Sequence, residues 1–243
     1  MSIYKKSPLA IIGLASEISQ SSPFFEHLLM LKEDMRGILA EVDGKVIWKE
    51  FKRLLKSEKP SIGIEVLRKI GILEIILPEL HNCYGVEQNK SYHKYTVYEH
   101  CLKACDACDR KDLRVRFAAL IHDIGKPEVK GCNNNGITFH KHEVASTKLA
   151  HNIVSRFGLR KKDASFIINL VRYHMYQYDR VWKDSTIKKF IKKVGLSKRH
   201  TKNIHEFPLF VLRDADRAGR GLKPITQKQI DFERRLVEIL TTT

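Results

Sequence analysis

The stretch LRVRFAALIHDIGKP, residues 113–127, decides how this chain folds, because its helical part is apolar almost all round. A helix that is apolar on every side lies at the centre of a globular protein rather than on its surface. The helical part ends with His122 and Asp123. A buried imidazole and a buried carboxylate are costly without partners, and a divalent cation suits both. The doublet therefore predicts a metal site whose other ligands come from elsewhere in the chain.

Apolar residues recur at helical spacing on both sides of this stretch, and no run alternates as a strand does. The chain is therefore predicted to be all-α. A soft boundary near residue 80 separates a small helical N-terminal segment, residues 1–80, from a main helical domain, residues 81–243. Within the main domain, residues 183–202 form a strongly basic helical segment, and residues 133–136 are expected in a loop.

The helix before the central one begins with Thr96 and Glu99, whose spacing is that of a capping box. It carries Cys101, Cys105 and Cys108 on one face. This arrangement fits close packing between helices better than a metal or redox cluster.

Composition narrows the class of partner. The chain has 243 residues, and 44 Lys and Arg against 28 Asp and Glu give it a formal charge of +16, which favours an anionic partner such as nucleic acid. Its five cysteines are odd in number, so we expect reduced thiols and a cytoplasmic location. No stretch approaches the roughly 20 apolar residues of a membrane span, so no membrane partner is expected.

Four further polar residues lie on the predicted buried faces of separate helices. They are His100, His142, His174 and Asp216. His174, for example, follows Val171 by three residues, so both lie on one helix face. Asp216 follows Leu212 by four residues, whereas Asp214 falls nearer the charged side of its helix. These four residues are the predicted partners of the doublet.

The doublet and its four predicted partners together indicate which metal ions and which reaction the site suits. Three or four imidazoles with two carboxylates suit one or two divalent ions such as Mn, Fe, Ni, Co or Mg. Two ions that share a carboxylate can generate hydroxide from water and stabilise an in-line displacement at phosphorus.

In chain order these residues form the pattern H…HD…H…H…D, which resembles the HD superfamily of metal-dependent phosphohydrolases. More closely, the chain resembles the C-terminal part of bacterial tRNA nucleotidyltransferases, the CCA-adding enzymes, and of their poly(A) polymerase relatives. The resemblance covers roughly residues 8–220 and is strongest over residues 60–175. The segments that carry it are Pro60-Ser-Ile-Gly63, Ile70-Gly-Ile-Leu73, Ile76-Leu-Pro-Glu-Leu80, Gly85-Val-Glu-Gln88, Tyr95-Thr-Val-Tyr-Glu-His-Cys-Leu102, residues 116–127, Phe139-His-Lys-His-Glu143 and Val171-Arg-Tyr-His-Met175.

The resemblance implies that residues 81–243 form an HD domain and that residues 1–80 form a neck-like segment. It also implies two metal sites that share Asp123. The first site would be held by His100, His122, Asp123 and Asp216, and the second would be completed by His142 and His174.

The implied activity is hydrolysis of phosphodiester or phosphomonoester bonds in nucleotides or RNA ends, with a 2′,3′-cyclic phosphodiesterase or phosphatase as the preferred form. A metal-bound hydroxide would be the nucleophile. Lys126, one turn beyond the doublet, is expected to contact the phosphate, with Arg213 or Arg217 assisting. His140 is the candidate general acid. A nucleotide or RNA, including tRNA, is the expected partner.

The chain departs from the resemblance in one respect. The nucleotidyltransferases carry a head with a Gly-Ser turn and a strand-borne Asp-x-Asp pair, and no segment of this sequence matches it. Asp214-Ala-Asp216 has the spacing but lies in a predicted helix. We therefore expect hydrolysis rather than polymerisation.

Other interpretations of the same residues stay open. The doublet could be a structural hydrogen bond, and His142 or His174 could be a core histidine, which would leave a single-metal site. The basic segment 183–202 could be a solvated helix face, and its aromatic residues interleave too weakly to predict base stacking. The second candidate function is therefore a non-catalytic RNA-binding partner of a separate nucleotidyltransferase subunit.

Overall fold

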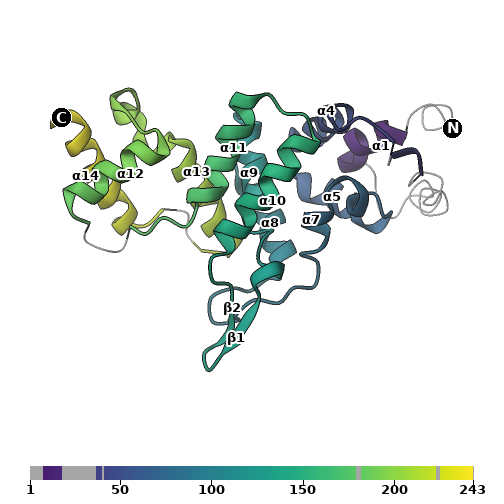
Figure 1. Ribbon diagram of the computed structural model, residues 1–243, viewed down its shortest axis with the longest axis horizontal. Helices are drawn as coiled ribbons and strands as arrows, with labels where there is room; N and C mark the ends of the chain where they lie inside the picture. Colours follow the sequence, from purple (N-terminus) through teal and green to yellow (C-terminus); the bar gives the residue numbers. More distant parts are fainter. Residues whose placement is uncertain (1–7, 18–36, 40, 179–181, 223–224, 243) are drawn as a thin grey trace.

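The fold is a chain of packed helices arranged along one long axis (Figure 1). The computed structural model describes residues 8–17, 37–39, 41–178, 182–222 and 225–242. Part of the predicted N-terminal segment, residues 1–80, lies outside the described residues.

The N-terminal helices lie at one end of the long axis (Figure 1). They are α1 (Pro8–Leu14), the 3-10 helix η1 (Ala15–Glu17), α4 (Gly44–Leu55), α5 (Pro60–Lys69), α6 (Leu73–Ile76) and α7 (Pro78–His81). Helix α4 begins at a cap in which the Asp43 side chain accepts a hydrogen bond from the amide of Lys45, and it buries Phe51, Leu54 and Leu55. This amphipathic pattern is the one that the sequence predicted for a helix packed on a neighbouring core.

The central helices form the middle of the molecule. They are α8 (Val97–Ala107), α9 (Leu113–Ile121), the 3-10 helix η2 (Pro127–Val129), α10 (His142–Arg156) and α11 (Lys161–Tyr173). Residues 115–121 of α9 are all buried, so the stretch that decides the fold is the central helix, as predicted. The capping box at the start of α8 is also confirmed, because Thr96 accepts from the amide of Glu99 and the Glu99 side chain accepts from the amide of Thr96.

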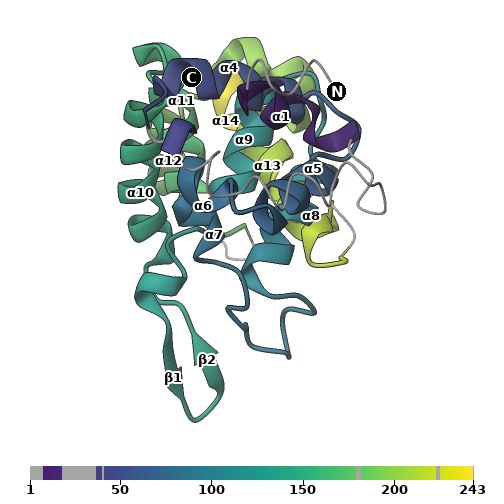
Figure 2. The ribbon, with the colours of Figure 1, turned by 90° about the vertical axis from the view of Figure 1, so that its right-hand side faces the viewer.

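A short β-hairpin corrects the prediction of a loop at residues 133–136. Strands β1 (Gly131–Asn133) and β2 (Gly136–Thr138) are antiparallel, with Cys132 paired to Ile137. The hairpin projects away from the helices (Figure 2). Its side chains are exposed or half-buried, so no alternation of apolar and polar residues marked it in the sequence.

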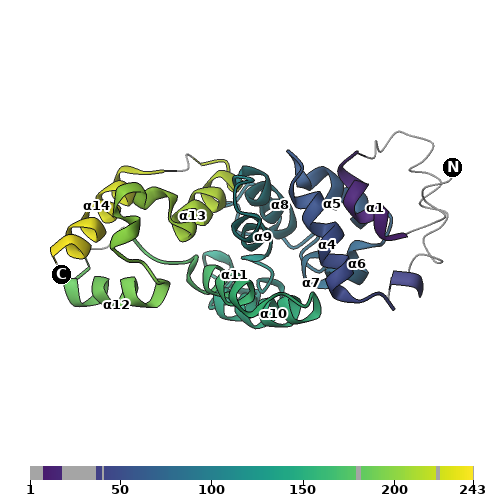
Figure 3. The same ribbon diagram turned by 90° about the horizontal axis from the view of Figure 1, so that it is seen from above.

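The C-terminal helices occupy the other end of the molecule, and α12 lies beyond the end of α11 (Figure 3). They are α12 (Asp184–Val194), the 3-10 helix η3 (Lys198–Glu206), α13 (Pro208–Gly219) and α14 (Gln227–Thr242). Helix α13 packs against α8 and α9, which brings the C-terminal part of the chain to the central helices.

Arg116 joins the N-terminal helices to the central ones. Its side chain is almost fully buried on α9, and its guanidinium donates to backbone carbonyls at the ends of α4 and α8. The acceptors are Leu55 O at 2.7 Å, Ser57 O at 2.7 Å, Glu58 O at 2.9 Å and Cys105 O at 3.1 Å. Carbonyls at a helix C-terminus have no partner within the helix and carry partial negative charge, so this buried cation satisfies both helix ends.

The described residues form one continuous apolar core from α1 to α14, and apart from the hairpin their regular structure is helical. The all-α prediction is confirmed. All five cysteines are free, and four of them are buried, which agrees with the expectation of reduced thiols. Among the described helices, none is both long enough and apolar enough to cross a membrane.

Candidate metal and phosphate site

The six residues predicted as ligands converge at the centre of the molecule from five separate segments. His100 lies on α8, the doublet follows α9, His142 is the first residue of α10, His174 follows α11, and Asp216 lies on α13. All six side chains are buried. Helical phase predicted the inward direction of the four partners of the doublet, and the structure brings these four side chains to it: His100, His142, His174 and Asp216.

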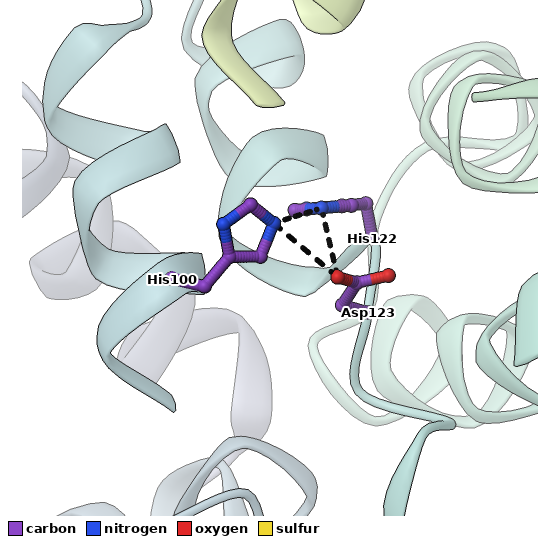
Figure 4. Close-up of side chains that lie close together, drawn as sticks. All are labelled: His100, His122 and Asp123. Carbon is purple, nitrogen blue, oxygen red and sulfur yellow. Dashed lines mark hydrogen bonds and ion pairs between the residues drawn. The ribbon is translucent and has the colours of Figure 1, made fainter. Parts of the chain in front are cut away.

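One group of ligand atoms surrounds the Oδ2 atom of Asp123. His100 and His122 point their Nε2 atoms toward each other at 3.0 Å and toward this oxygen at 3.3 Å each (Figure 4). Oδ1 of Asp216 lies 3.2 Å from His100 Nε2 and 3.7 Å from His122 Nε2. These four side chains form the first ligand group.

A second group surrounds the other oxygen of the same carboxylate. Oδ1 of Asp123 lies 3.2 Å from His142 Nε2 and 3.6 Å from His174 Nε2. All three atoms are buried, and none has a hydrogen-bond partner among the described residues. Asp123 therefore presents one oxygen to each group.

The backbone orients three of the four imidazoles. The Nδ1 atoms of His122, His142 and His174 lie 2.7–2.8 Å from the carbonyl oxygens three residues earlier in the chain. A carbonyl can only accept, so each Nδ1 carries a proton and donates. Each Nε2 is thereby directed at the two carboxylates, which is how metal-binding histidines are usually held.

The charges in the site are strongly coupled. Burial would raise the pKa of both carboxyls, but His122 and Lys126 hold the pKa of Asp123 well below the usual range. His100, His122 and Arg220 do the same for the pKa of Asp216. Burial lowers the pKa of His122, but the two carboxylates outweigh this effect and raise it to about 10. Burial lowers the pKa of His174 to about 4. Two ionised carboxylates thus face the imidazoles at neutral pH, and the negative charge that stabilises an imidazolium also stabilises a divalent cation.

Two arginines hold Asp216 in place. Arg213 Nη1 and Arg220 Nη2 each donate to Asp216 Oδ2 at 3.0 Å, so the Oδ1 atom faces His100. Arg220 was missed in the sequence, although its position four residues after Asp216 on the same helix is the spacing of a helical ion pair.

Lys126 lies against Asp123. Its Nζ atom is 2.6 Å from Asp123 Oδ2 and donates to Gln88 Oε1 at 2.6 Å. Gln88 is held in turn because its Nε2 donates to the carbonyl of Tyr95. A lysine has three N–H donors, so one remains after these two contacts. The predicted phosphate contact is therefore also an ion-pair partner of the central carboxylate.

Two glycines allow the segments to approach this closely. A Cβ atom on Gly125 would lie 2.2 Å from the backbone nitrogen of Ser146, so the turn after the doublet contacts α10 at its backbone. A Cβ atom on Gly219 would lie 2.9 Å from the backbone nitrogen of Ala104, so α13 contacts α8 in the same way. These contacts bring Asp123 close to α10 and Asp216 close to α8.

A cavity of about 210 Å³ opens onto both ligand groups. Its lining includes Asp123, Asp216 and three cations, Lys126, Arg213 and Arg220. A neutral imidazole, His93, also lines it; burial lowers the pKa of this residue to about 3, and its ring packs edge-on against His100.

Gln88 and His93 lie in the loop before α8. Helical phase says nothing about loops, so the direction of their side chains could not be predicted from spacing.

Two predicted substrate residues lie outside the lining of this cavity. His140 is exposed in the segment between β2 and α10. Arg217 donates to the hydroxyl of Tyr178 at 3.2 Å.

The donor set fits divalent metal ions. Ligand atoms about 2.1 Å from one ion lie roughly 3.0–3.5 Å from each other, and the distances within each group are close to this range. The buried, unpartnered atoms of the second group have the lone pairs that a cation would satisfy. Either one or two ions can be held by these residues.

Comparison with known protein families gives two matches. The model of the HD domain matches residues 90–217. A second model, described as the probable RNA and SrmB-binding site of polymerase A, matches residues 33–84.

Several curated relatives are named multifunctional CCA proteins. The one from Thioalkalivibrio sulfidiphilus is 30% identical over 249 residues, which cover 95% of this chain and 58% of the relative. That from Hahella chejuensis is 29% identical and covers 97% of this chain and 57% of the relative. That from Dechloromonas aromatica is 32% identical over 70% of this chain and 43% of the relative. The chain thus spans about half the length of the curated relatives it matches.

Proposed function

The chain belongs to the HD-domain family, whose model matches more than half of its residues, and from this premise we propose that it is a metal-dependent phosphohydrolase acting on nucleotides or RNA. The HD domain indicates a metal-dependent hydrolase. The type of bond that is hydrolysed and the identity of the substrate go beyond the family match and belong to the proposal.

One observation carries this proposal: Asp123 presents its two oxygens to two separate groups of buried ligand atoms. A carboxylate placed between two groups of buried ligand atoms would suit one or two divalent ions better than it suits a structural hydrogen bond. The three cations that line the cavity add the positive charge that a phosphate ester requires.

The side chains take distinct parts in the proposed reaction. His100, His122, Asp123 and Asp216 would hold one ion, and Asp123, His142 and His174 the other. When bound, the metal supplies Lewis acidity and an activated water. Lys126 and Arg213 would orient the phosphate by donating to its non-bridging oxygens. Arg220 would keep Asp216 oriented, and the buried walls would exclude bulk water.

We propose a 2′,3′-cyclic phosphodiester or a terminal phosphomonoester as the substrate group. The relatives are named CCA proteins, and the second family match carries an RNA-binding description, so an RNA end is the preferred source. His140 and Arg217 would contact the part of the substrate that extends beyond the cavity.

A phosphoester panel tests the proposal. Purified protein should hydrolyse 2′,3′-cyclic AMP or a nucleoside monophosphate when Mn, Ni, Co or Mg is supplied, and Asp123→Asn should lower the rate by about a thousandfold or more with helicity unchanged. Absence of hydrolysis with every metal, or equal rates for the variant, would reject the proposal.

A second candidate function rests on the family match over residues 33–84 and on the charge of +16. The chain would then bind RNA, including tRNA, beside a separate nucleotidyltransferase subunit and would not catalyse hydrolysis. This candidate predicts salt-dependent tRNA affinity that Asp123→Asn leaves unchanged. A tRNA affinity that does not change with ionic strength would count against this candidate function.

A further inference from the structure

A second cavity adjoins the site, between the C-terminal end of α11 and helix α12. Its volume is about 380 Å³, within the roughly 300–1,000 Å³ typical of small-ligand sites. Four aromatic side chains line it: Tyr173, Tyr176, Trp182 and Phe190. Figure 3 shows α12 beyond the end of α11, where this cavity lies.

Three of these aromatic residues, Tyr176, Trp182 and Phe190, form one packed group. The rings of Trp182 and Phe190 meet edge to face at 5.4 Å between centroids, and Tyr176 packs on Phe190 at 5.5 Å. These residues come from segments that are separate in the sequence, so spacing along the basic segment 183–202 showed no stacking surface. The fold brings these rings together beside the cavity, which the sequence pattern did not predict.

The second cavity lies next to the site. Met175, which directly follows the predicted ligand His174, lines both cavities. Arg213 lines the site cavity, and its guanidinium lies 5.9 Å from the centroid of the Tyr176 ring. A molecule held against the aromatic group therefore lies next to the phosphate position.

Cations surround the aromatic lining. Arg172, Lys189 and Lys193 contribute three positive charges, against one carboxylate from Glu143. Lys189 and Lys193 are one helical turn apart on α12, so they point to the same side. Nη1 of Arg172 is buried and has no hydrogen-bond partner within the described ranges of the chain.

We propose that this cavity binds the nucleotide next to the phosphate held at Asp123, with its base against the aromatic lining and its own phosphate on Lys189 and Lys193. Flat aromatic groups beside cations are the usual means of holding single-stranded RNA, because bases stack and phosphates pair with the cations. The inference rests on the proposed function and deepens it: a strand of at least two nucleotides is the preferred substrate, and a mononucleotide binds the same site more weakly.

Tryptophan fluorescence tests the base position directly. The chain has two tryptophans, so Trp48→Phe leaves Trp182 as the only reporter. In that background, with Asp123→Asn added to prevent turnover, a 5′-phosphorylated diadenylate should quench Trp182 and should bind on the order of tenfold more tightly than AMP. Absence of quenching, or equal affinity for the two probes, would overturn the inference.

The charge contacts are tested with a matched pair of variants on one helix. Lys189→Gln with Lys193→Gln removes two cations that line the cavity, and Lys188→Gln with Lys192→Gln removes two exposed cations that do not. The first pair should weaken diadenylate binding on the order of tenfold, and the second by about twofold or less at moderate salt. Equal loss from both pairs would assign the affinity to net charge and contradict the inference.

The same measurements separate this inference from the proposed function. Quenching of Trp182 that persists while the phosphoester panel shows no hydrolysis would support the cavity as an RNA site and reject the hydrolase. Hydrolysis of a mononucleotide without Trp182 quenching by diadenylate would support the hydrolase and overturn the cavity assignment.

Discussion

Asp123 is the residue on which the site depends. Among the described residues, it is the only side chain that contributes an oxygen to both ligand groups: Oδ2 lies 3.3 Å from His122 Nε2 and Oδ1 lies 3.2 Å from His142 Nε2. Charge explains its surroundings, because the Lys126 ammonium and the His122 imidazole, whose pKa is raised to about 10, offset the buried carboxylate.

Arg220 holds the side chain of Asp216 in its orientation. Replacing Arg220 tests how much this orientation contributes to metal affinity. Arg220→Met should leave Asp216 with one guanidinium partner and lower metal affinity by about 10–100-fold, because residues that orient a ligand contribute at this level. Isothermal titration with Mn²⁺ measures this effect. Arg234→Met removes an exposed arginine paired with Asp231 and serves as the control; equal affinities for both variants would show that Arg220 has no such role.

At the residue scale, helical phase predicted which polar side chains on the helices point inward. His100, His174 and Asp216 lie on the apolar faces of helices, so their inward direction followed from spacing. His93 reaches the cavity and Gln88 reaches Lys126 from a loop, whose path depends on tertiary contacts such as the hydrogen bond from Gln88 to Tyr95. No spacing rule describes such a path.

At the scale of elements, the site depends on how closely α13 approaches α8. Gly219→Ala should lower the free energy of unfolding, because an overpacking cost of about 1–3 kcal/mol exceeds the gain of about 1 kcal/mol in helix propensity. It should also lower metal affinity by moving Asp216 away from His100. Urea unfolding and metal titration measure both effects. The control is Gly37→Ala, where a Cβ atom meets nothing within 4 Å; a stable variant with unchanged affinity would contradict this account.

The contact between α13 and α14 contains a buried polar cluster that gives a pH prediction. Gln229 donates to both Asp214 and Glu233, and burial with the nearby Asp214 charge raises the pKa of Glu233 above its usual 4.5. A raised carboxyl pKa means that the folded state binds the proton more tightly. The stability from this group is therefore complete below pH 4.5 and is lost as the pH rises through the folded-state pKa.

Glu233→Gln isolates that effect. The variant should gain stability relative to the wild type as the pH rises from 4 to about 7, since the amide carries no charge to desolvate. Urea unfolding at several pH values measures the difference, with exposed Glu238→Gln as the control. A difference between variant and wild type that stays constant with pH would contradict the prediction.

Elements differ in how well the sequence predicted them. The capping box at Thr96 and the apolar helix at residues 113–121 are local signals, and both are confirmed. The hairpin of β1 and β2 was missed because three-residue strands with exposed side chains leave no apolar pattern. Its pairing comes from backbone hydrogen bonds that the side chains do not reveal.

For the whole molecule, Arg116 tests whether the N-terminal helices and the central helices are held as one body. Arg116→Met should lower the free energy of unfolding by about 3 kcal/mol or more, because it removes the side-chain donor of four backbone carbonyls, including the buried carbonyl of Leu55 at the end of α4. Arg53→Met removes an exposed ion pair and should cost about 1 kcal/mol or less. Urea unfolding compares the two; similar losses would show that Arg116 does not join the segments.

The predicted division near residue 80 stays a proposal at this scale. The two family matches, at residues 33–84 and 90–217, fall on either side of the loop before α8. The apolar core nevertheless runs continuously from one region to the other. Composition and helix pattern indicate a change in the chain there, but they cannot show contacts such as those of Arg116.

The most direct test of the central claim is the metal content of purified protein measured by mass spectrometry. If Asp123 bridges two ligand groups, His174→Gln should lose metal from the second group and Asp216→Asn from the first, whereas Asp123→Asn should lose metal from both and retain its helical circular dichroism. Wild-type protein that binds no divalent metal, or Asp123→Asn protein that retains the wild-type metal content, would contradict the account.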